Sequence, residues 1–107
     1  MFKWFKIFNL NKLKKSNRMI FYINGVYILI LRINNKFFAF EDNCPHQNMP
    51  INKGKILKNK FIVCPFHNAS FCIKTGLTKK NLSIDNLNAF KLKFNNNSVS
   101  IKVFISC

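Results

Sequence analysis

The chain has 107 residues, a formal net charge of +15 and 49% hydrophobic residues, with 13 phenylalanines among them. This length holds one domain with a modest core and excludes a second catalytic domain. The hydrophobic and aromatic content excludes a disordered chain, so we expect a single folded domain over residues 1–107.

The positive charge alone would favour a nucleic-acid partner, but its make-up argues against one. Lysine supplies 16 of the 18 basic residues, they are scattered along the chain, and only Arg18 and Arg32 carry the fork that suits phosphate and guanine. Lys, Asn, Ile and Phe, which all have A/T-rich codons, fill more than half of the chain. We therefore attribute the charge to composition, expect no nucleic-acid partner, and expect an acidic docking partner to be favoured.

The N-terminal half predicts strands separated by asparagine-rich turns. Four segments are rich in aromatic and β-branched residues: Trp4–Phe8, Met19–Ile23, Tyr27–Ile33 and Phe37–Phe40. Asn24-Gly25 is a strong hairpin signal, and Asn34-Asn35 is a second turn pair. Asn9–Lys15 could form at most a helical turn or two, and Trp4 is expected in the core rather than against a ligand.

The C-terminal part predicts two more strands. Phe90–Phe94 and Val99–Ile105 flank the turn Asn95-Asn96-Asn97, and the alternation of Phe90, Leu92 and Phe94 with lysines is the period of a half-buried strand. Helical periodicity is not sustained anywhere. The chain is therefore expected to be all-β and mostly antiparallel.

Neither a targeting segment nor a membrane segment is indicated. Lysines interrupt the N-terminal apolar residues, and the longest apolar run, Val26–Leu31, is far shorter than the roughly 20 residues of a spanning helix. We expect a cytoplasmic protein without a membrane partner. In that compartment the four cysteines favour metal binding over disulfides.

The candidate site consists of Cys44, His46, Cys64 and His67, which form C-x-H and C-x-x-H blocks. These blocks use both histidines of the chain, and all three prolines lie in the same stretch. Two cysteines and two histidines could hold a tetrahedral zinc ion. Zinc fingers usually pair Cys with Cys and His with His, however, whereas each block here mixes the two. Such mixing suits two irons bridged by sulfides, one bound by both thiolates and the other by both imidazoles.

The motif CPHQNMPINKG…FIVCPFHNASFCIKTG resembles the signature of Rieske 2Fe–2S proteins, and the similarity to small Rieske-type ferredoxins extends along almost the whole chain. The resemblance implies a Rieske-like antiparallel β-sandwich with a small cluster-binding subdomain of two loops at about 43–76. It implies one Rieske-type 2Fe–2S cluster per chain. Cys44 and Cys64 would hold the buried iron, and His46 and His67 the outer iron.

Four positions distinguish this chain from high-potential Rieske proteins. Met49 and Phe66 stand where cytochrome-complex members carry a disulfide, so that bridge cannot form. Ala69 and Phe71 stand where those members place a serine and a tyrosine that hydrogen-bond the cluster sulfurs. Fewer hydrogen bonds stabilise the reduced cluster less, so we expect a midpoint potential of roughly −150 mV rather than +300 mV.

The predicted function is that of a soluble one-electron carrier, not an enzyme, between a flavin-dependent or iron–sulfur reductase and a terminal oxygenase or other redox enzyme. A catalytic oxygenase subunit needs two further histidines for its mononuclear iron, and none remains. The histidine count therefore excludes the catalytic subunit of a ring-hydroxylating dioxygenase and leaves its ferredoxin component, which the chain resembles. The alternatives are a small subunit of an assimilatory nitrite reductase and a basic zinc-binding nucleic-acid module.

Three further features are expected to have mainly structural roles. Cys72 is expected to be a small buried hydrophobe, with a thiol near the cluster as the alternative, and Cys107 is expected to have no role. Glu41-Asp42 is expected to cap the turn into the first block. The lysines between the blocks form either a solvated loop or a positive collar that steers an acidic partner: Lys53, Lys55, Lys58 and Lys60.

Overall fold

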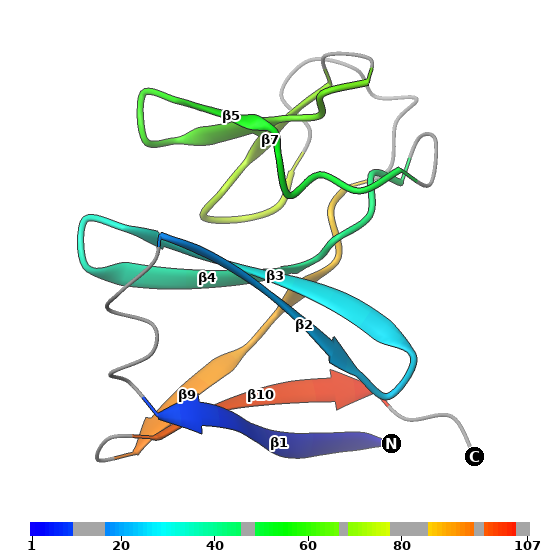
Figure 1. Ribbon diagram of the computed structural model, residues 1–107, viewed down its shortest axis with the longest axis vertical. Coiled ribbons are helices and arrows are strands. Elements are labelled where there is room, and N and C mark those ends of the chain that lie inside the picture. Colours follow the sequence, from blue (N-terminus) through cyan, green and yellow to red (C-terminus); the bar gives the residue numbers. More distant parts are fainter. Residues whose placement is uncertain (10–16, 46–48, 67–68, 78–85, 96–97, 105–107) are drawn as a thin grey trace.

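Three antiparallel sheets make up the structure, a computed structural model that describes residues 1–9, 17–45, 49–66, 69–77, 86–95 and 98–104. The first sheet, in the order β1-β10-β9, contains β1 (Phe2–Asn9), β9 (Leu92–Asn95) and β10 (Ser98–Phe104). The middle sheet, in the order β2-β3-β4-β8, contains β2 (Arg18–Ile23), β3 (Val26–Ile33), β4 (Lys36–Glu41) and β8 (Ala89–Phe90). The third sheet, in the order β5-β6-β7, contains β5 (Lys55–Leu57), β6 (Phe61–Val63) and β7 (Ser70–Cys72). Figure 1 shows the middle sheet between the other two, and the predicted all-β class is confirmed.

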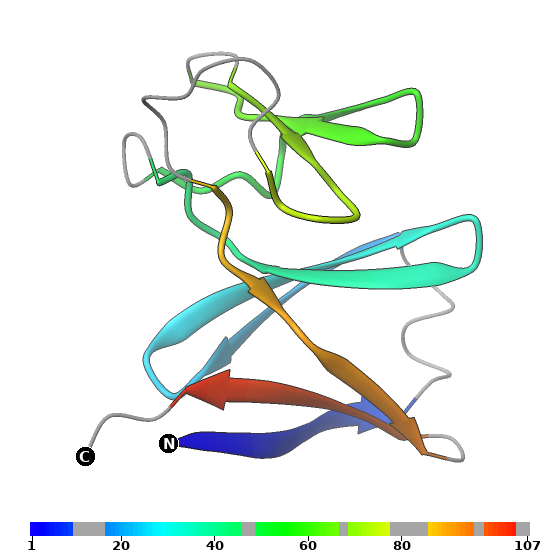
Figure 2. The same ribbon diagram turned by 180° about the vertical axis from the view of Figure 1, so that it is seen from behind.

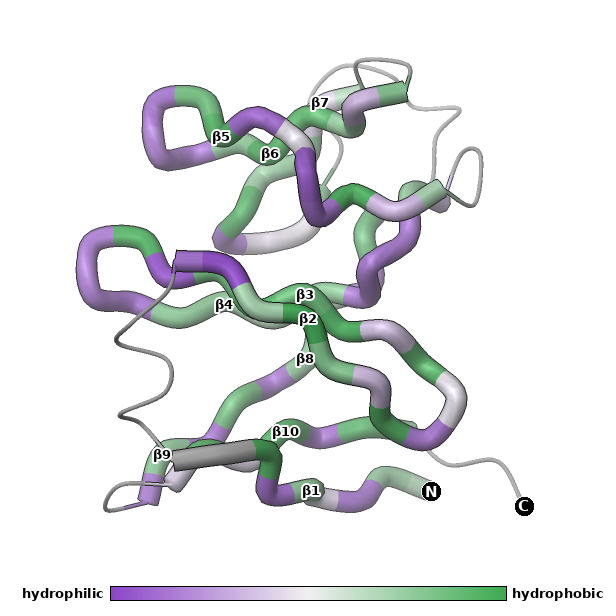
Figure 3. The backbone as a smooth tube through the Cα atoms, viewed as in Figure 1, coloured by the Kyte–Doolittle hydropathy of each residue, from purple (hydrophilic) through white to green (hydrophobic). Residues whose placement is uncertain are grey.

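The hairpins of the middle sheet form at the predicted turns. Asn24 and Gly25 have φ of 51° and 83°, and Asn34 and Asn35 have φ of 53° and 63°. Two consecutive residues with positive φ match the right-handed twist of the flanking strands, and asparagine and glycine adopt this conformation at low cost. Figure 3 shows the same pattern in hydropathy, with hydrophilic turns at the tips of largely hydrophobic hairpins.

Strand β3 is buried on both faces and separates two cores. Ile28 and Ile30 pack with Val99 and Ile101 of β10 in the core toward the first sheet. Leu29 and Leu31 point the other way, into the core that contains residues of the third sheet and both predicted cysteine ligands. Burial on both faces explains why this strand is a continuous apolar run rather than an alternating one.

The predicted strand Phe90–Phe94 is divided between two sheets. Strand β8 pairs with β4, and β9 pairs with β10, with Lys91 between them. Figure 2 shows this segment crossing from the middle sheet to the first sheet. The Lys102 amide donates to the Lys91 carbonyl at 3.0 Å, so the crossing point remains hydrogen-bonded to the first sheet.

Two expectations differ from the structure. Trp4 is 42% exposed, so its predicted place in the core is wrong. Strand β1 turns Phe5 and Ile7 toward the core instead, and Trp4 lies on the opposite face, where the Lys93 ammonium is 5.6 Å from its ring centroid. The three strands of the third sheet were not predicted, because segments of three residues show no measurable periodicity.

Some predictions fall on parts that the structure leaves undescribed or untested. Asn9 ends β1, and the rest of the possible helical turn at 9–15 lies outside the described residues. No helix long and apolar enough to cross a membrane occurs in the described part of the chain. The third sheet lies within the subdomain predicted at about 43–76, and those domain boundaries stay a prediction.

Candidate metal centre

Two loops beside the third sheet carry the predicted cysteine ligands, and both loops are closed in the same way. The first loop joins β4 to β5, and the Cys44 amide donates to the Met49 carbonyl at 2.7 Å. The second joins β6 to β7, and the Cys64 amide donates to the Ala69 carbonyl at 2.8 Å. Each hydrogen bond spans five residues and fixes the backbone at the cysteine. The histidine of each block falls between these positions in sequence, and both histidines lie outside the described residues.

The two thiols lie in one apolar core. Cys44 and Cys64 are 0% exposed and belong to the same hydrophobic cluster, together with Ile51, Ile62 and Phe71. Among the described cysteines no disulfide is formed. Cys44 follows a strand of the middle sheet, and Cys64 follows a strand of the third sheet. Both thiols are free of disulfides in the same buried core and can therefore serve as thiolate ligands of a metal site.

Gly54 allows the first loop to lie directly on β6. A Cβ at this position would collide with the carbonyl oxygen of Val63, the residue before Cys64, and would lie 3.1 Å from the Ile51 carbonyl oxygen. The Gly54 amide donates to that Ile51 carbonyl at 2.9 Å. Only glycine permits this approach of two backbones. The sequence shows Gly54 among turn-forming residues, but not that it touches the second loop.

Asp42 pins the first loop across its base. Its Oδ1 accepts a hydrogen bond from the Ile51 amide at 2.8 Å, and its Oδ2 accepts one from the Asn52 side chain at 2.7 Å. The predicted capping of this turn is thus confirmed for Asp42. Glu41 instead accepts a weaker bond of 3.3 Å from Asn88 at the exposed surface.

Cys72 lies apart from the two buried thiols. It ends β7, is half-buried, and is not a member of their hydrophobic cluster. A side-chain hydrogen bond from Thr75 lowers the pKa of the Cys72 thiol, with further help from backbone hydrogen bonds and the nearby Lys74 charge. The predicted role as an inert buried hydrophobe is therefore only partly met, and Cys107 lies outside the described residues.

The described residues supply half of the predicted ligand set. Within them no group of three or more His, Cys, Asp and Glu side chains could hold a metal ion, since both histidines fall outside. The half that is described fits a metal cluster, because both thiols are unbridged, buried and carried on loops of matching closure. Met49 and Phe66, which stand where cytochrome-complex Rieske proteins carry a disulfide, differ in exposure. Met49 is half-buried, and Phe66 is 55% exposed.

An all-β body carries two buried thiols on paired loops at one end, and this geometry fits the protein side of a metal-cluster site. The comparison with known families makes this specific, since residues 3–91 match the model of the Rieske [2Fe-2S] domain. The chain belongs to this family, and its cofactor is a Rieske-type 2Fe–2S cluster.

Curated relatives share part of the sequence. The 3-phenylpropionate/cinnamic acid dioxygenase ferredoxin subunit of Photorhabdus laumondii is 41% identical over 49 residues, which is 46% of this chain and 47% of that protein. The Escherichia coli K12 protein of the same name is 37% identical over 49 residues. Apoptosis-inducing factor 3 of Mus musculus is 32% identical over 70% of this chain and 12% of its own length. The matches thus span about half the length of the ferredoxin subunits.

Solved structures support the fold. The ferredoxin of carbazole 1,9a-dioxygenase from Nocardioides aromaticivorans IC177 superposes with a TM-score of 0.78 at 18% identity, covering 92% of this chain and 95% of that one. A chain from a complex of reduced oxygenase and oxidized ferredoxin in carbazole 1,9a-dioxygenase gives 0.77 at 23% identity, covering 92% and 91%. At these identities the likeness establishes the architecture alone.

The Gly54 contact predicts that Gly54→Ala lowers stability by about 1–3 kcal/mol, because its Cβ must displace the Val63 carbonyl. Iron content should fall with it, since the two cysteine loops separate. Urea unfolding and iron per chain measure the two effects. Gly25→Ala is the control: its Cβ meets open space, so strain at φ +83° costs about 1–2 kcal/mol and iron loading stays unchanged. Equal iron content in the two variants would contradict the role given to Gly54.

The Asp42 contacts predict that Asp42→Ala lowers the free energy of unfolding by about 1–3 kcal/mol, because the part-buried Ile51 amide loses its acceptor. Denaturant titration of the purified protein measures this loss. Glu41→Ala removes the same charge one residue earlier, where the hydrogen bond is exposed, and should cost less than about 0.5 kcal/mol. If both variants lose the same stability, Asp42 acts through its charge alone.

Proposed function

We propose that this chain is a one-electron carrier, which accepts an electron from a reductase and passes it to a terminal oxygenase or another redox enzyme. The observation that carries the proposal is the pair of buried, unbridged thiols on matching loops in a chain of the Rieske family. Two relatives named as dioxygenase ferredoxin subunits support it.

The proposed ligands are Cys44 and Cys64 for one iron and His46 and His67 for the other. A Rieske cluster supplies one reversible electron at a potential higher than that of an all-cysteine cluster, because two neutral imidazoles replace two thiolates. The chain's own contribution is to keep the two thiols dry and fixed. Their amides are anchored to carbonyls five residues further on, and Gly54 and Asp42 hold the first loop in place.

A catalytic role is not proposed. A mononuclear non-haem iron needs two histidines and a carboxylate, and the sequence has only two histidines in all. With His46 and His67 assigned to the cluster, none remains for such a centre. The chain is therefore proposed as the carrier of a multicomponent oxidoreductase system.

The end of the molecule that carries the two cysteine loops, the loop end, is proposed as a transient docking surface. Phe66 is 55% exposed, and Pro50 and Pro65 on the two cysteine loops are also exposed. Two exposed lysines, Lys53 and Lys55, lie where the first loop meets β6, because Lys55 pairs with Val63, the residue before Cys64. Lys58 and Lys60 are also exposed, but they belong to the turn at the tip of the β5–β6 hairpin, which extends away from the two loops (Figure 1). An apolar centre with positive charge on one side would suit a redox partner with an acidic surface, and charge would mainly speed the encounter. A cytoplasmic location stays a prediction.

Metal analysis and electron paramagnetic resonance of the dithionite-reduced protein test the proposal. We expect two irons and two acid-labile sulfides per chain, and a rhombic signal with the low average g-value of mixed nitrogen and sulfur ligation. Cys64→Ser and His67→Ser should abolish the signal. Cys72→Ser, which replaces the half-buried thiol outside the shared core, should retain it.

The other results are equally informative. A colourless protein that holds zinc without sulfide would overturn the carrier and favour the zinc-binding module. A loaded protein that is isolated only with a large subunit would favour the nitrite-reductase alternative. A signal that survives His67→Ser would overturn the proposed ligand set while leaving the cluster in place.

The apolar side chains beside the thiols predict a low midpoint potential, about −150 mV, that an added hydroxyl should raise. Phe71 is fully buried with Cys64, so Phe71→Tyr places a hydroxyl in that core. A hydrogen bond that favours the reduced state by ~1.4 kcal/mol corresponds to about 60 mV for one electron. A redox titration followed by circular dichroism measures the shift. Phe66→Tyr adds the same hydroxyl to an exposed ring and should leave the potential unchanged; equal shifts would contradict the prediction.

A further inference from the structure

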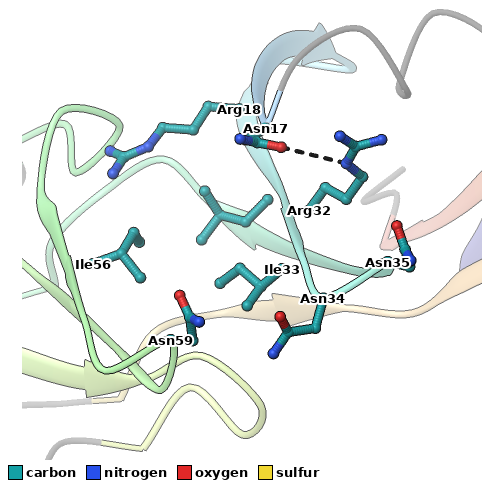
Figure 4. Close-up of a pocket in the computed structure, with 9 residues that line it drawn as sticks. Asn17, Arg18, Arg32, Ile33, Asn34, Asn35, Ile56 and Asn59 are labelled. Carbon is teal, nitrogen blue, oxygen red and sulfur yellow. Dashed lines mark hydrogen bonds between the residues drawn. The ribbon is translucent and has the colours of Figure 1, made fainter.

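A pocket of about 400 Å³ lies where the middle sheet meets the β5–β6 hairpin. The described residues that line it are two arginines, four asparagines and three aliphatic residues, with no Asp or Glu among them. Figure 4 shows the two guanidinium groups on either side of Asn17, and Asn34 and Asn59 across the pocket from them. The polar part of this lining therefore supplies only positive charge and amide groups.

The arginines are the informative part of this lining. The chain has 16 lysines but only Arg18 and Arg32, and both line this one pocket. Arg18 lies opposite Leu31 in the β2–β3 register, one residue before Arg32, so the two arginines are neighbours at the edge of the middle sheet with their side chains on opposite faces of the hairpin. Both are half-buried, whereas all the described lysines except Lys102 are exposed. The planar, bidentate donor set of arginine matches phosphate better than the point charge of lysine does.

Both guanidinium groups are held in place by the protein. Arg18 Nη1 donates to the Asn52 carbonyl at 2.6 Å, across the gap to the loop that precedes β5. Arg32 Nε donates to Asn17 Oδ1 at 3.3 Å, and the Arg32 amide donates to the Asn17 carbonyl at 2.9 Å. Fixing these side chains in advance lowers the entropy lost when a ligand binds.

The rest of the lining suits the organic part of a ligand. Leu31, Ile33 and Ile56 provide an aliphatic surface on which a flat ring could lie. Asn34 and Asn59 have φ of 53° and 55°, which accounts for asparagine at these two turns. Their amides nonetheless face the same pocket and can both donate and accept hydrogen bonds.

We propose that this pocket binds a small organic phosphate with more than one phosphoryl group, of the nucleoside diphosphate class. The two guanidinium groups lie apart, on either side of Asn17, so a ligand that contacts both must extend along the edge of the sheet, as a chain of phosphoryl groups joined to an organic group can. The volume is in the range of small-molecule sites. Neither cysteine lines the pocket, although Leu31 belongs to the core of Cys44 and Cys64, and Ile33 and Ile56 pack against that core.

Isothermal titration calorimetry of the cluster-loaded protein with ADP, AMP, adenosine, pyrophosphate and inorganic phosphate tests this proposal. We expect ADP to bind at one site per chain, more tightly than AMP, and adenosine to bind weakest. Arg32→Gln should weaken ADP binding by about tenfold, or ~1.4 kcal/mol. Lys102→Gln removes an equal charge from β10 in the first sheet and should change the affinity less than twofold. Arg32→Lys, which keeps the charge without the fork, should resemble Arg32→Gln.

The ligands and variants separate the possible outcomes. Pyrophosphate that binds as tightly as ADP would support the phosphate site and assign it to a free diphosphate rather than to a nucleotide. Equal binding of ADP and adenosine, or no binding of any probe at millimolar concentration, would overturn the proposal. Equal losses in Arg32→Gln and Lys102→Gln would overturn it as well, since net charge alone would then explain the binding. Thermal unfolding confirms that each variant is folded.

Discussion

The close approach of the first loop to β6 is the constraint on which the metal centre depends. Cys44 and Cys64 come from segments that end strands of different sheets, and nothing in their local sequence brings them together. The backbone contact between Gly54 and Val63 does so, because it fixes one loop directly beside the residue that precedes the second cysteine. The hydrogen bonds within each loop then set the direction of each thiol, and the Asp42 carboxylate prevents the longer loop from opening.

Strand β3 gives this arrangement a rigid base. Its side chains pack alternately into two cores, so the cysteine core and the core toward the first sheet share one wall. This shared wall is a strand that is hydrogen-bonded on both sides, to β2 and β4. The segment that crosses at Lys91 adds a second covalent link between the middle and first sheets. A rigid scaffold of this kind can position the loops that carry a binding site.

The sequence predicts the larger strands because local chemistry determines them. Asn24-Gly25 forms the expected hairpin whatever lies around it, since those residues tolerate positive φ. Long-range contacts could not be predicted from the sequence. The strands of the third sheet have three residues each and show no periodicity, and Gly54 matters because it lies against Val63 in another segment. Trp4 was misplaced because an aromatic residue in a strand can lie on either face of the sheet. Which face is buried depends on the middle sheet that packs against β1, and this contact cannot be read from the local sequence. The pocket was hidden for the same reason, because Arg18 and Arg32 become neighbours only through strand pairing.

The charge of the chain links the two proposed binding surfaces. Glu41 and Asp42 are the acids in the described part of the chain, and both accept hydrogen bonds that organise the start of the first loop. Lys58 and Lys60 lie on either side of Asn59 of the pocket, in the turn between β5 and β6, and add positive charge to the surroundings of a phosphate bound there. Lys53 and Lys55 flank Gly54, which contacts the residue before Cys64, and add positive charge beside the cysteine loops. Charge would therefore favour an anion in the pocket and an acidic partner at the loops, and added salt should weaken both interactions by screening.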